Sequence, residues 1–329
     1  MRHSAKKWSG ALAAAVLIAG AGAVRAQLPQ HPFIDHGDNG EIIHVLPTPA
    51  SVHSPHDTQP TDYDAARGLS VFPGSYGSGN LTDHGGPEIS NAQFRAIYWN
   101  SSVANSTATS LGIGTIKDQI DGFVSAFSST SNYARRSTDD YAIIQQYGSR
   151  NAISPSLGNL GYHIDSRAAA SRLSDSGVQS YLASLFDAGS ETPSGSTLYG
   201  VYFPSGMKIS LQGGTSCSSF CGYHSHFTYN GTVIKYAVFP YTDCRACSVT
   251  GKTVADILTI VTSHEIREAV TDSLGTAWYD AQGYEADDKC AWHNLYQMQS
   301  GGYWVQPEYS NGGTKGGISY PGPGCVVAK

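Results

Sequence analysis

A histidine and two glutamates stand at metal-ligand spacing in one short stretch of the chain. His264 and Glu268 are four residues apart, so on an α-helix their side chains project from one face about one turn apart. Two side chains in this relation can hold a metal ion, as they do in the His-Glu-x-x-His metallopeptidases. In those enzymes the glutamate directly after the first ligand takes a proton from the metal-activated water. Glu265 holds that position, so the spacing predicts His264 and Glu268 as metal ligands and Glu265 as the general base.

A third ligand is expected from a separate acidic segment. Glu285 lies 17 residues after Glu268, and Asp288 lies three residues further on. In one class of zinc peptidases a glutamate roughly 20 residues past the helix pair completes the site, and an aspartate behind it orients a ligand histidine. We therefore expect Glu285 to bind the ion and Asp288 to support it, or the two roles to be exchanged. Carboxylate ligands suit zinc, but they also allow Mn²⁺ or Ca²⁺.

The same stretch has a simpler interpretation as an ordinary amphipathic helix. Apolar residues recur at helical spacing from about 253 to 271 and predict a helix there. Glu265 and Glu268 would then be solvated charges, and His264 a core or surface residue. Asp272, which follows the predicted helix, would cap or buttress its end. The metal site is favoured, because a carboxylate beside a buried histidine is rare without a partner.

The elements that must position these residues begin after a predicted secretion signal. The first residues are basic, a run of apolar residues follows at 11–19, and small residues lead to Ala26. This order is typical of a signal peptide cleaved after Ala26, so residues 1–26 are expected to be removed and the protein secreted. The apolar run is shorter than the roughly 20 residues of a membrane span. No membrane span is therefore expected.

The charge balance narrows the class of partner. Removing residues 1–26 takes away Arg2, Lys6, Lys7 and Arg25 but no acid, so the formal net charge changes from -6 to -10. An acidic chain without a run of lysine or arginine argues against nucleic acid or an anionic membrane as partner. A surface poor in charge and rich in glycine and tyrosine suits an extracellular protein that meets a peptide or a carbohydrate.

The cysteines are concentrated in the C-terminal half of the chain. An even number of cysteines behind a secretion signal is typical of disulfide bonds. The alternative is a zinc site, because a Cys-x3-Cys pair followed by a Cys-x2-Cys pair resembles ligand spacing. The expected disulfides are Cys217–Cys221, Cys244–Cys247 and Cys290–Cys325.

Two further histidines follow the first cysteine pair. A short disulfide loop would present His224 and His226, which could bind metal or stabilise a transition state, and His224 is our candidate for a catalytic residue. The alternative is a rigid loop with solvated histidines. The chain has no Gly-x-Ser-x-Gly elbow, Walker loop or Rossmann glycine pattern, so a serine hydrolase or a nucleotide-dependent enzyme lacks support.

The mature chain divides into two parts by composition. Residues 27–80 contain many prolines and histidines without apolar periodicity, which predicts an extended arm, linker or pro-segment with solvated histidines. Residues 81–329 have the pattern of one folded domain. Strands are expected near 94–99, 141–144, 198–203 and 234–239, and helices near 108–128, near 174–186 with Ser174 as N-cap, and at 253–271.

Strands mixed with helices predict an α/β or α+β fold around one mixed sheet. The expected architecture is a single zincin-like domain with a long active-site helix and a disulfide-stabilised C-terminal half.

Several motifs together resemble the EXORDIUM (phosphate-induced protein) family of secreted plant cell-wall proteins and their bacterial relatives. The resemblance covers nearly all of residues 81–329 and implies a secreted protein at or beyond the cell wall, without implying a reaction. The plant members lack the His-Glu-x-x-Glu pattern, so this sequence is similar to a branch that has gained a metal site. The matching motifs are His84-Gly85-Gly86-Pro87, Tyr98-Trp99, Cys217-x3-Cys221-Gly222-x-His224, Cys244-x2-Cys247, Ala269-Val270-Thr271-Asp272, Ala277-Trp278-Tyr279, the acidic run into Cys290, and Trp304-Val305-Gln306.

These observations favour a secreted zinc metallopeptidase that acts on a peptide or protein substrate. The alternative is a non-catalytic cell-wall or glycan-binding protein with a structural metal site. A glycosidase that uses two of the carboxylates is a weaker third reading, since no pair can be placed at the required separation from sequence.

Overall fold

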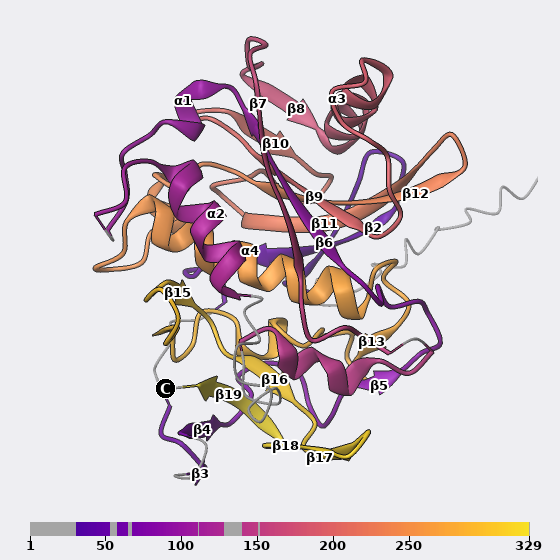
Figure 1. Ribbon diagram of the computed structural model, residues 1–329, viewed down its shortest axis with the longest axis vertical. Coiled ribbons are helices and arrows are strands. Elements are labelled where there is room, and N and C mark those ends of the chain that lie inside the picture. The colour runs from indigo at the N-terminus through magenta and orange to yellow at the C-terminus, as the bar shows by residue number, and fades with distance from the viewer. Residues whose placement is uncertain are drawn as a thin grey trace, which may run out of the picture. The chain divides into compact units, whose positions relative to one another are not determined.

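A seven-stranded mixed sheet, in the order β1-β2-β11-β12-β9-β6-β7, is the framework of the fold (Figure 1). The strands β12, β9, β6 and β7 run parallel to one another, and β1, β2 and β11 extend the sheet by antiparallel pairing. The predicted mixed sheet is therefore confirmed. The strands are β1 (Ile34–His36), β2 (Ile42–Pro47), β6 (Gln93–Trp99), β7 (Gly158–Asp165), β9 (Thr197–Tyr202), β11 (Phe220–Tyr229) and β12 (Thr232–Phe239).

This computed structural model describes residues 31–52, 58–64, 68–110, 112–127, 140–150 and 152–328. The predicted secretion signal at 1–26 lies outside the described residues. None of the described helices has the length and apolar character needed to cross a membrane.

Helices cover both faces of the sheet. Helix α3 (Asp175–Asp187) packs on one face, where Val178 and Leu182 join apolar side chains of the central strands. Helix α4 (Val254–Thr271) packs on the other face together with α2 (Ile116–Phe127). The central strands are buried on both faces, which explains why their sequences are continuous apolar runs. The short helix α1 spans Ser101–Ala104.

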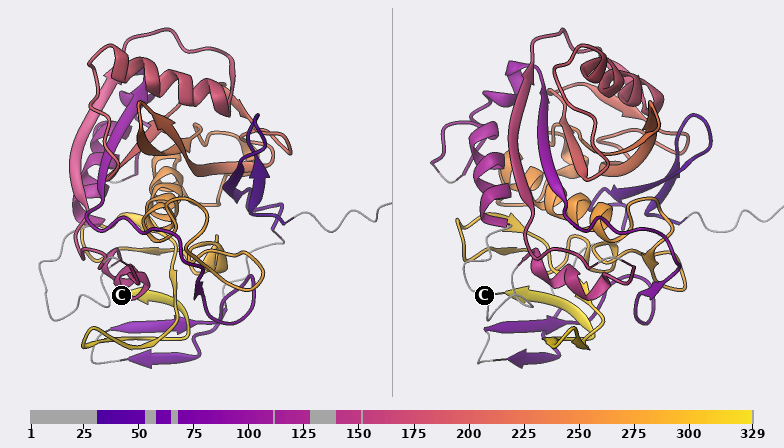
Figure 2. Two further views of the ribbon diagram at one scale, coloured as in Figure 1. Left: turned by 90° about the vertical axis from the view of Figure 1, so that its right-hand side faces the viewer. Right: turned by 45° about the vertical axis from the view of Figure 1, so that its right-hand side comes forward.

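Helix α4 is enclosed on all sides. A capping box starts it: Thr253 accepts a hydrogen bond from the backbone of Asp256, and the Asp256 carboxylate accepts one from the backbone of Thr253. The helix lies between the seven-stranded sheet and the C-terminal part of the chain (Figures 1 and 2). Every residue from Ala255 to Thr271 is buried. Its glutamates are therefore not solvated charges, in contrast to the simpler interpretation of the sequence.

The C-terminal part is built from short strands. A four-stranded sheet has the order β16-β19-β4-β3, and the described residues also form four two-stranded sheets. The four-stranded sheet consists of β16 (Glu308–Ser310), β19 (Gly324–Ala328), β4 (Leu69–Phe72) and β3 (Asp62–Asp64). The pairs are β10 (Lys208–Ser210) with β8 (Arg172–Ser174), β13 (Trp278–Tyr279) with β5 (Thr82–Asp83), β14 (Tyr296–Gln297) with β15 (Trp304–Val305), and β17 (Gly313–Lys315) with β18 (Ile318–Tyr320).

Two predicted elements differ from the structure. The segment 27–80 is expected to be an extended arm, yet its described parts supply β1 and β2 to the main sheet and β3 and β4 to the smaller one. Strands this short carry too few apolar positions to show a period. The predicted strand at 141–144 is the 3₁₀ helix η2 (Ala142–Tyr147), because a run of four apolar residues fits a buried turn as well as a strand. Among the described residues, η3 (Arg245–Cys247) and η4 (Asp288–Cys290) are also 3₁₀ helices.

The six cysteines form three disulfides, of which one pairs as predicted. Cys290–Cys325 is confirmed, whereas the two predicted local pairs are wrong and are replaced by Cys217–Cys244 and Cys221–Cys247. The reason is the β11–β12 hairpin. Antiparallel pairing brings the residues before β11 next to those after β12, so each cysteine meets a partner across the hairpin instead of its sequence neighbour.

Candidate metal centre

Three parts of the fold bring ligand-type side chains to one buried place. Helix α4 contributes His264 and Glu268, and the segment that leads into η4 contributes Glu285 and Asp288. The adjacent strands β2 and β11 add a histidine each: His44 is the register partner of His224. Paired residues of antiparallel strands project to the same face of the sheet, which here is the face that α4 covers.

The first group of ligand atoms consists of His264 Nε2, Glu268 Oε2 and Asp288 Oδ1. The imidazole nitrogen lies 2.9 Å from the Glu268 oxygen and 3.7 Å from the Asp288 oxygen. None of the three atoms has a hydrogen-bond partner, although all are buried. His264 Nε2 and Glu268 Oε2 are close enough for an ion pair without hydrogen-bond geometry, and a residue trio of this kind can hold a metal ion.

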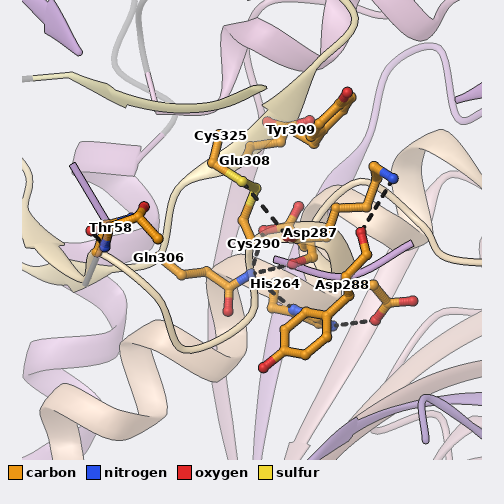
Figure 3. The surroundings of a disulfide bond; sticks show 12 residues. Thr58, His264, Asp287, Asp288, Cys290, Gln306, Glu308, Tyr309 and Cys325 are labelled. Atoms are coloured by element: carbon orange, nitrogen blue, oxygen red, sulfur yellow. Dashed lines mark hydrogen bonds and ion pairs between the residues drawn. A yellow bond between two sulfur atoms is a disulfide. The ribbon is translucent and has the colours of Figure 1, made fainter. Parts of the chain in front are cut away.

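Hydrogen bonds from the backbone fix these side chains. The Asp288 backbone N–H donates to Glu268 Oε1 at 2.9 Å, and the Glu285 backbone N–H donates to Asp288 Oδ2 at 3.1 Å. Each carboxylate is thus held by one oxygen and leaves the other free for an ion. The Cys290–Cys325 disulfide ties the segment to β19 just beyond Asp288 (Figure 3).

Gln306 controls the orientation of the His264 ring. Its side-chain nitrogen lies 3.1 Å from His264 Nδ1 and donates to the Asp287 main-chain oxygen at 2.8 Å (Figure 3). An ion at Nε2 requires the ring proton to sit on Nδ1. Gln306 can accept that proton only through Oε1, which has no hydrogen-bond partner. Turning Oε1 toward His264 would give up the donations of the amide nitrogen to the main-chain oxygen of Asp287 at 2.8 Å and to Asp287 Oδ1 at 3.2 Å, so an ion at Nε2 competes with these two hydrogen bonds.

The second set of contacts joins the two strand histidines to Glu285 and Glu265. His44 Nδ1 lies 2.7 Å from Glu285 Oε2, and His224 Nε2 lies 3.8 Å from the same oxygen. His224 Nδ1 lies 3.1 Å from Glu265 Oε2. With its proton on Nδ1, His224 donates to Glu265 and turns the lone pair of Nε2 toward Glu285, an arrangement typical of metal-ligating histidines.

Burial and mutual repulsion raise the pKa values of the carboxyl groups. Burial raises the pKa of Glu265 well above its usual value, and repulsion by Glu268, Asp288 and Glu285 raises it further. Burial likewise raises the pKa values of Glu268, Glu285 and Asp288 well above their usual range. Burial lowers the pKa of His264 and lowers that of His224 further. These directions describe a site that resists negative charge until a cation enters.

Arg267, which lies on α4 between Glu265 and Glu268 in sequence, is already paired. Its guanidinium donates to the carboxylate of Asp287 through Nε at 3.1 Å and through Nη2, and Nε lies 3.8 Å from Glu308. In the part of the chain that the structure describes, no lysine or arginine forms an ion pair with Glu265, Glu268, Glu285 or Asp288. Arg267 therefore holds the supporting acids and leaves the site without a resident cation.

The sequence predicts most of the members of this site and misses others. The structure brings together all six predicted residues, which are His224, His264, Glu265, Glu268, Glu285 and Asp288. The acid that lies beside the pair of His264 and Glu268 is Asp288 and not Glu285. Asp272 buttresses the end of α4, since its Oδ1 accepts from the backbones of Thr276 and Ala277. His226 belongs to none of the candidate ligand groups among the described residues.

The most important omission is His44. The composition of 27–80 predicts solvated histidines, but His44 is buried against Glu285. The alternative zinc site at the cysteines is wrong, because Cys217, Cys244 and Cys247 lie close together only as members of disulfides and offer no thiolate.

Comparisons of the chain with protein-family models, curated proteins and solved structures gave no match. The resemblance to the EXORDIUM family stays a prediction from the sequence motifs.

Removing the ion should destabilise the protein more as the pH rises. Without an ion, the raised carboxyl pKa values favour protonated acids in the folded state, so stability falls as pH rises past their unfolded values. The lowered pKa values of His264 and His224 make stability rise with pH, but only below about pH 6.5, the usual pKa of histidine. We therefore expect a chelator to lower Tm more at about pH 8 than at about pH 6.5. An equal loss of Tm at both pH values would contradict this electrostatic description.

Proposed function

We propose that this chain is a secreted metal-dependent hydrolase, specifically a zinc metallopeptidase. His264, Glu268 and Asp288 would hold the ion, and Glu265 would act as the general base. The observation that carries the proposal is the convergence of three buried ligand atoms without a hydrogen-bond partner, together with a fourth buried carboxylate, Glu265, that shares contacts to His224 with Glu268. Leaving such atoms without a partner costs free energy that an ion would recover.

One carboxylate oxygen of Glu265 contacts a histidine, and the other has no hydrogen-bond partner. Oε2 lies 3.1 Å from His224 Nδ1, while Oε1 has no hydrogen-bond partner. Oε1 packs close to Gly222 of β11, where a Cβ would lie 3.0 Å from Oε1 and 2.3 Å from Val261 Cγ1, so a side chain at this position would displace its neighbours. A zinc ion held by these ligands would lower the pKa of a bound water to about 7. Glu265 Oε1 would take the proton of that water and return it to the leaving group.

The reaction class follows from the residues beside the ion. A peptide bond is cleaved by water when a Lewis acid polarises the carbonyl and a base removes the water's proton, and both groups would be supplied here. His224 would hold Glu265 in place through its Nδ1–H. Of the members of this centre, His44 and His224 retain the most exposure, at 7% and 4%, so a substrate would approach from the β2–β11 side.

The near-complete burial of the centre favours a second candidate function. Ions that stabilise a fold are enclosed by protein ligands, whereas catalytic ions keep an open position. A non-catalytic extracellular cell-wall or glycan-binding protein with a structural ion would fit the same residues. In that case chelation would lower Tm, and the protein would cleave no peptide either with or without the ion.

The test combines metal content with a screen for hydrolysis. A metallopeptidase binds zinc and cleaves a broad set of peptides, loses both properties on chelation, and regains both when zinc is returned. Bound metal without cleavage of any peptide supports the structural candidate instead.

A further inference from the structure

We propose that the centre holds two divalent ions instead of one. This deepens the proposed function and rests on it. The second ion would lie between the strand histidines and Glu285, and would share carboxylates with the ion beside His264. The candidate ligand groups of this centre have carboxylates in common.

The three groups divide the ligands in a regular way. One consists of His264, Glu268 and Asp288, another of His224, Glu268 and Glu285, and the third of His44, Glu285 and Asp288. Every group has a different histidine, and every carboxylate belongs to two groups. The ligand atoms within each group lie within 4.8 Å of one another. This is close to the separation of about 4.4 Å, twice the longest usual bond to nitrogen or oxygen, that two ligands of one zinc ion can have. Separate histidines joined by shared carboxylates are therefore the pattern of a centre with bridged ions.

Partnerless atoms on the second side provide an independent observation. Both carboxylate oxygens of Glu285 and Nδ1 of His44 are buried and have no hydrogen-bond partner. His44 Nδ1 lies 2.7 Å from Glu285 Oε2, yet the two atoms lack hydrogen-bond geometry. These atoms lie outside the group around His264, so an ion held by His264, Glu268 and Asp288 alone would leave them unsatisfied.

The charge of the centre also fits two ions. Glu265, Glu268, Glu285 and Asp288 are at most 1% exposed, and among the described residues none of them pairs with lysine or arginine. Two divalent cations balance four ionised carboxylates. One cation would compensate only two of these carboxylates and would leave the other two either protonated or buried as uncompensated charges.

The stoichiometry of bound metal tests the second ion. The full chain, purified without a histidine tag and loaded with zinc, should contain about two ions by mass spectrometry. His44→Ala should contain about one ion, because the His264 group stays intact. His226→Ala is the matched control: it removes a histidine of β11 that belongs to none of the groups, and it should keep about two ions.

A second measurement uses the unchanged protein, in case His44→Ala does not fold. Electron paramagnetic resonance of the manganese-loaded chain should show two interacting ions. One ion in the wild type together with peptide hydrolysis would overturn the second ion and leave the proposed function standing. No bound ion would overturn both, and two ions in His44→Ala would refute the placement of the second ion.

Discussion

Glu265→Gln should abolish peptide hydrolysis and leave the metal content unchanged. The amide keeps the size of the side chain and can still contact His224 Nδ1 through its oxygen, but it cannot take a proton from water. General bases contribute about 10²- to 10⁴-fold, so kcat should fall by about that factor while KM changes little. The measurement is steady-state kinetics on a peptide that the wild-type chain cleaves, next to metal analysis of the same samples.

Glu191→Gln is the matched control for this substitution. Glu191 is also a buried glutamate, but its partner is Arg95, on strand β6. It should keep full activity. Full activity of Glu265→Gln would contradict the assigned role of the base, whereas loss of metal along with activity would make Glu265 a positioning residue for His224.

Arg267→Met should destabilise the protein by about 3–5 kcal/mol. Arg267 is fully buried and donates to Asp287, and it also donates to the main-chain oxygens of Gln306 and Asp140 at 3.1 Å each. Methionine fills much of the same volume, so the loss comes from charge and not from a cavity. Asp287 and Glu308 would remain buried without their cation. Urea-induced unfolding of variant and wild type gives the difference in free energy.

Arg167→Met provides the comparison for a surface ion pair. The Arg167 side chain is 45% exposed and pairs with Asp165, and exposed pairs contribute at most about 1 kcal/mol. If Arg267→Met costs no more than Arg167→Met, the buried acids beside the centre do not depend on Arg267.

Helix α4 and its candidate ligands could be predicted from sequence because their signals are local. The apolar period and the Thr253 cap define the helix, and the spacing of His264 and Glu268 depends only on helical geometry. The predicted strands at 94–99, 198–203 and 234–239 and the Ser174 cap of α3 are likewise confirmed, since buried parallel strands leave unbroken apolar runs.

The remaining members of the centre depend on pairings that are distant in sequence. His44 reaches the centre because β2 pairs with β11, and nothing in the composition of 27–80 indicates that pairing. Cys221 bonds Cys247 across a hairpin for the same reason. Asp288, not Glu285, lies beside His264 because the backbone N–H of Asp288 binds Glu268, a detail that residue spacing does not contain.

Metal analysis of the purified wild-type chain beside Glu268→Ala tests the central claim most directly. Glu268 belongs to two of the three candidate ligand groups at this centre, including the group around His264, so its truncation should remove bound metal. Zinc bound in the wild type, lost in Glu268→Ala and retained in a Glu191→Ala control, is the predicted result. No divalent transition metal in the wild type, after loading with zinc or manganese, would contradict the metal centre and the hydrolase built on it.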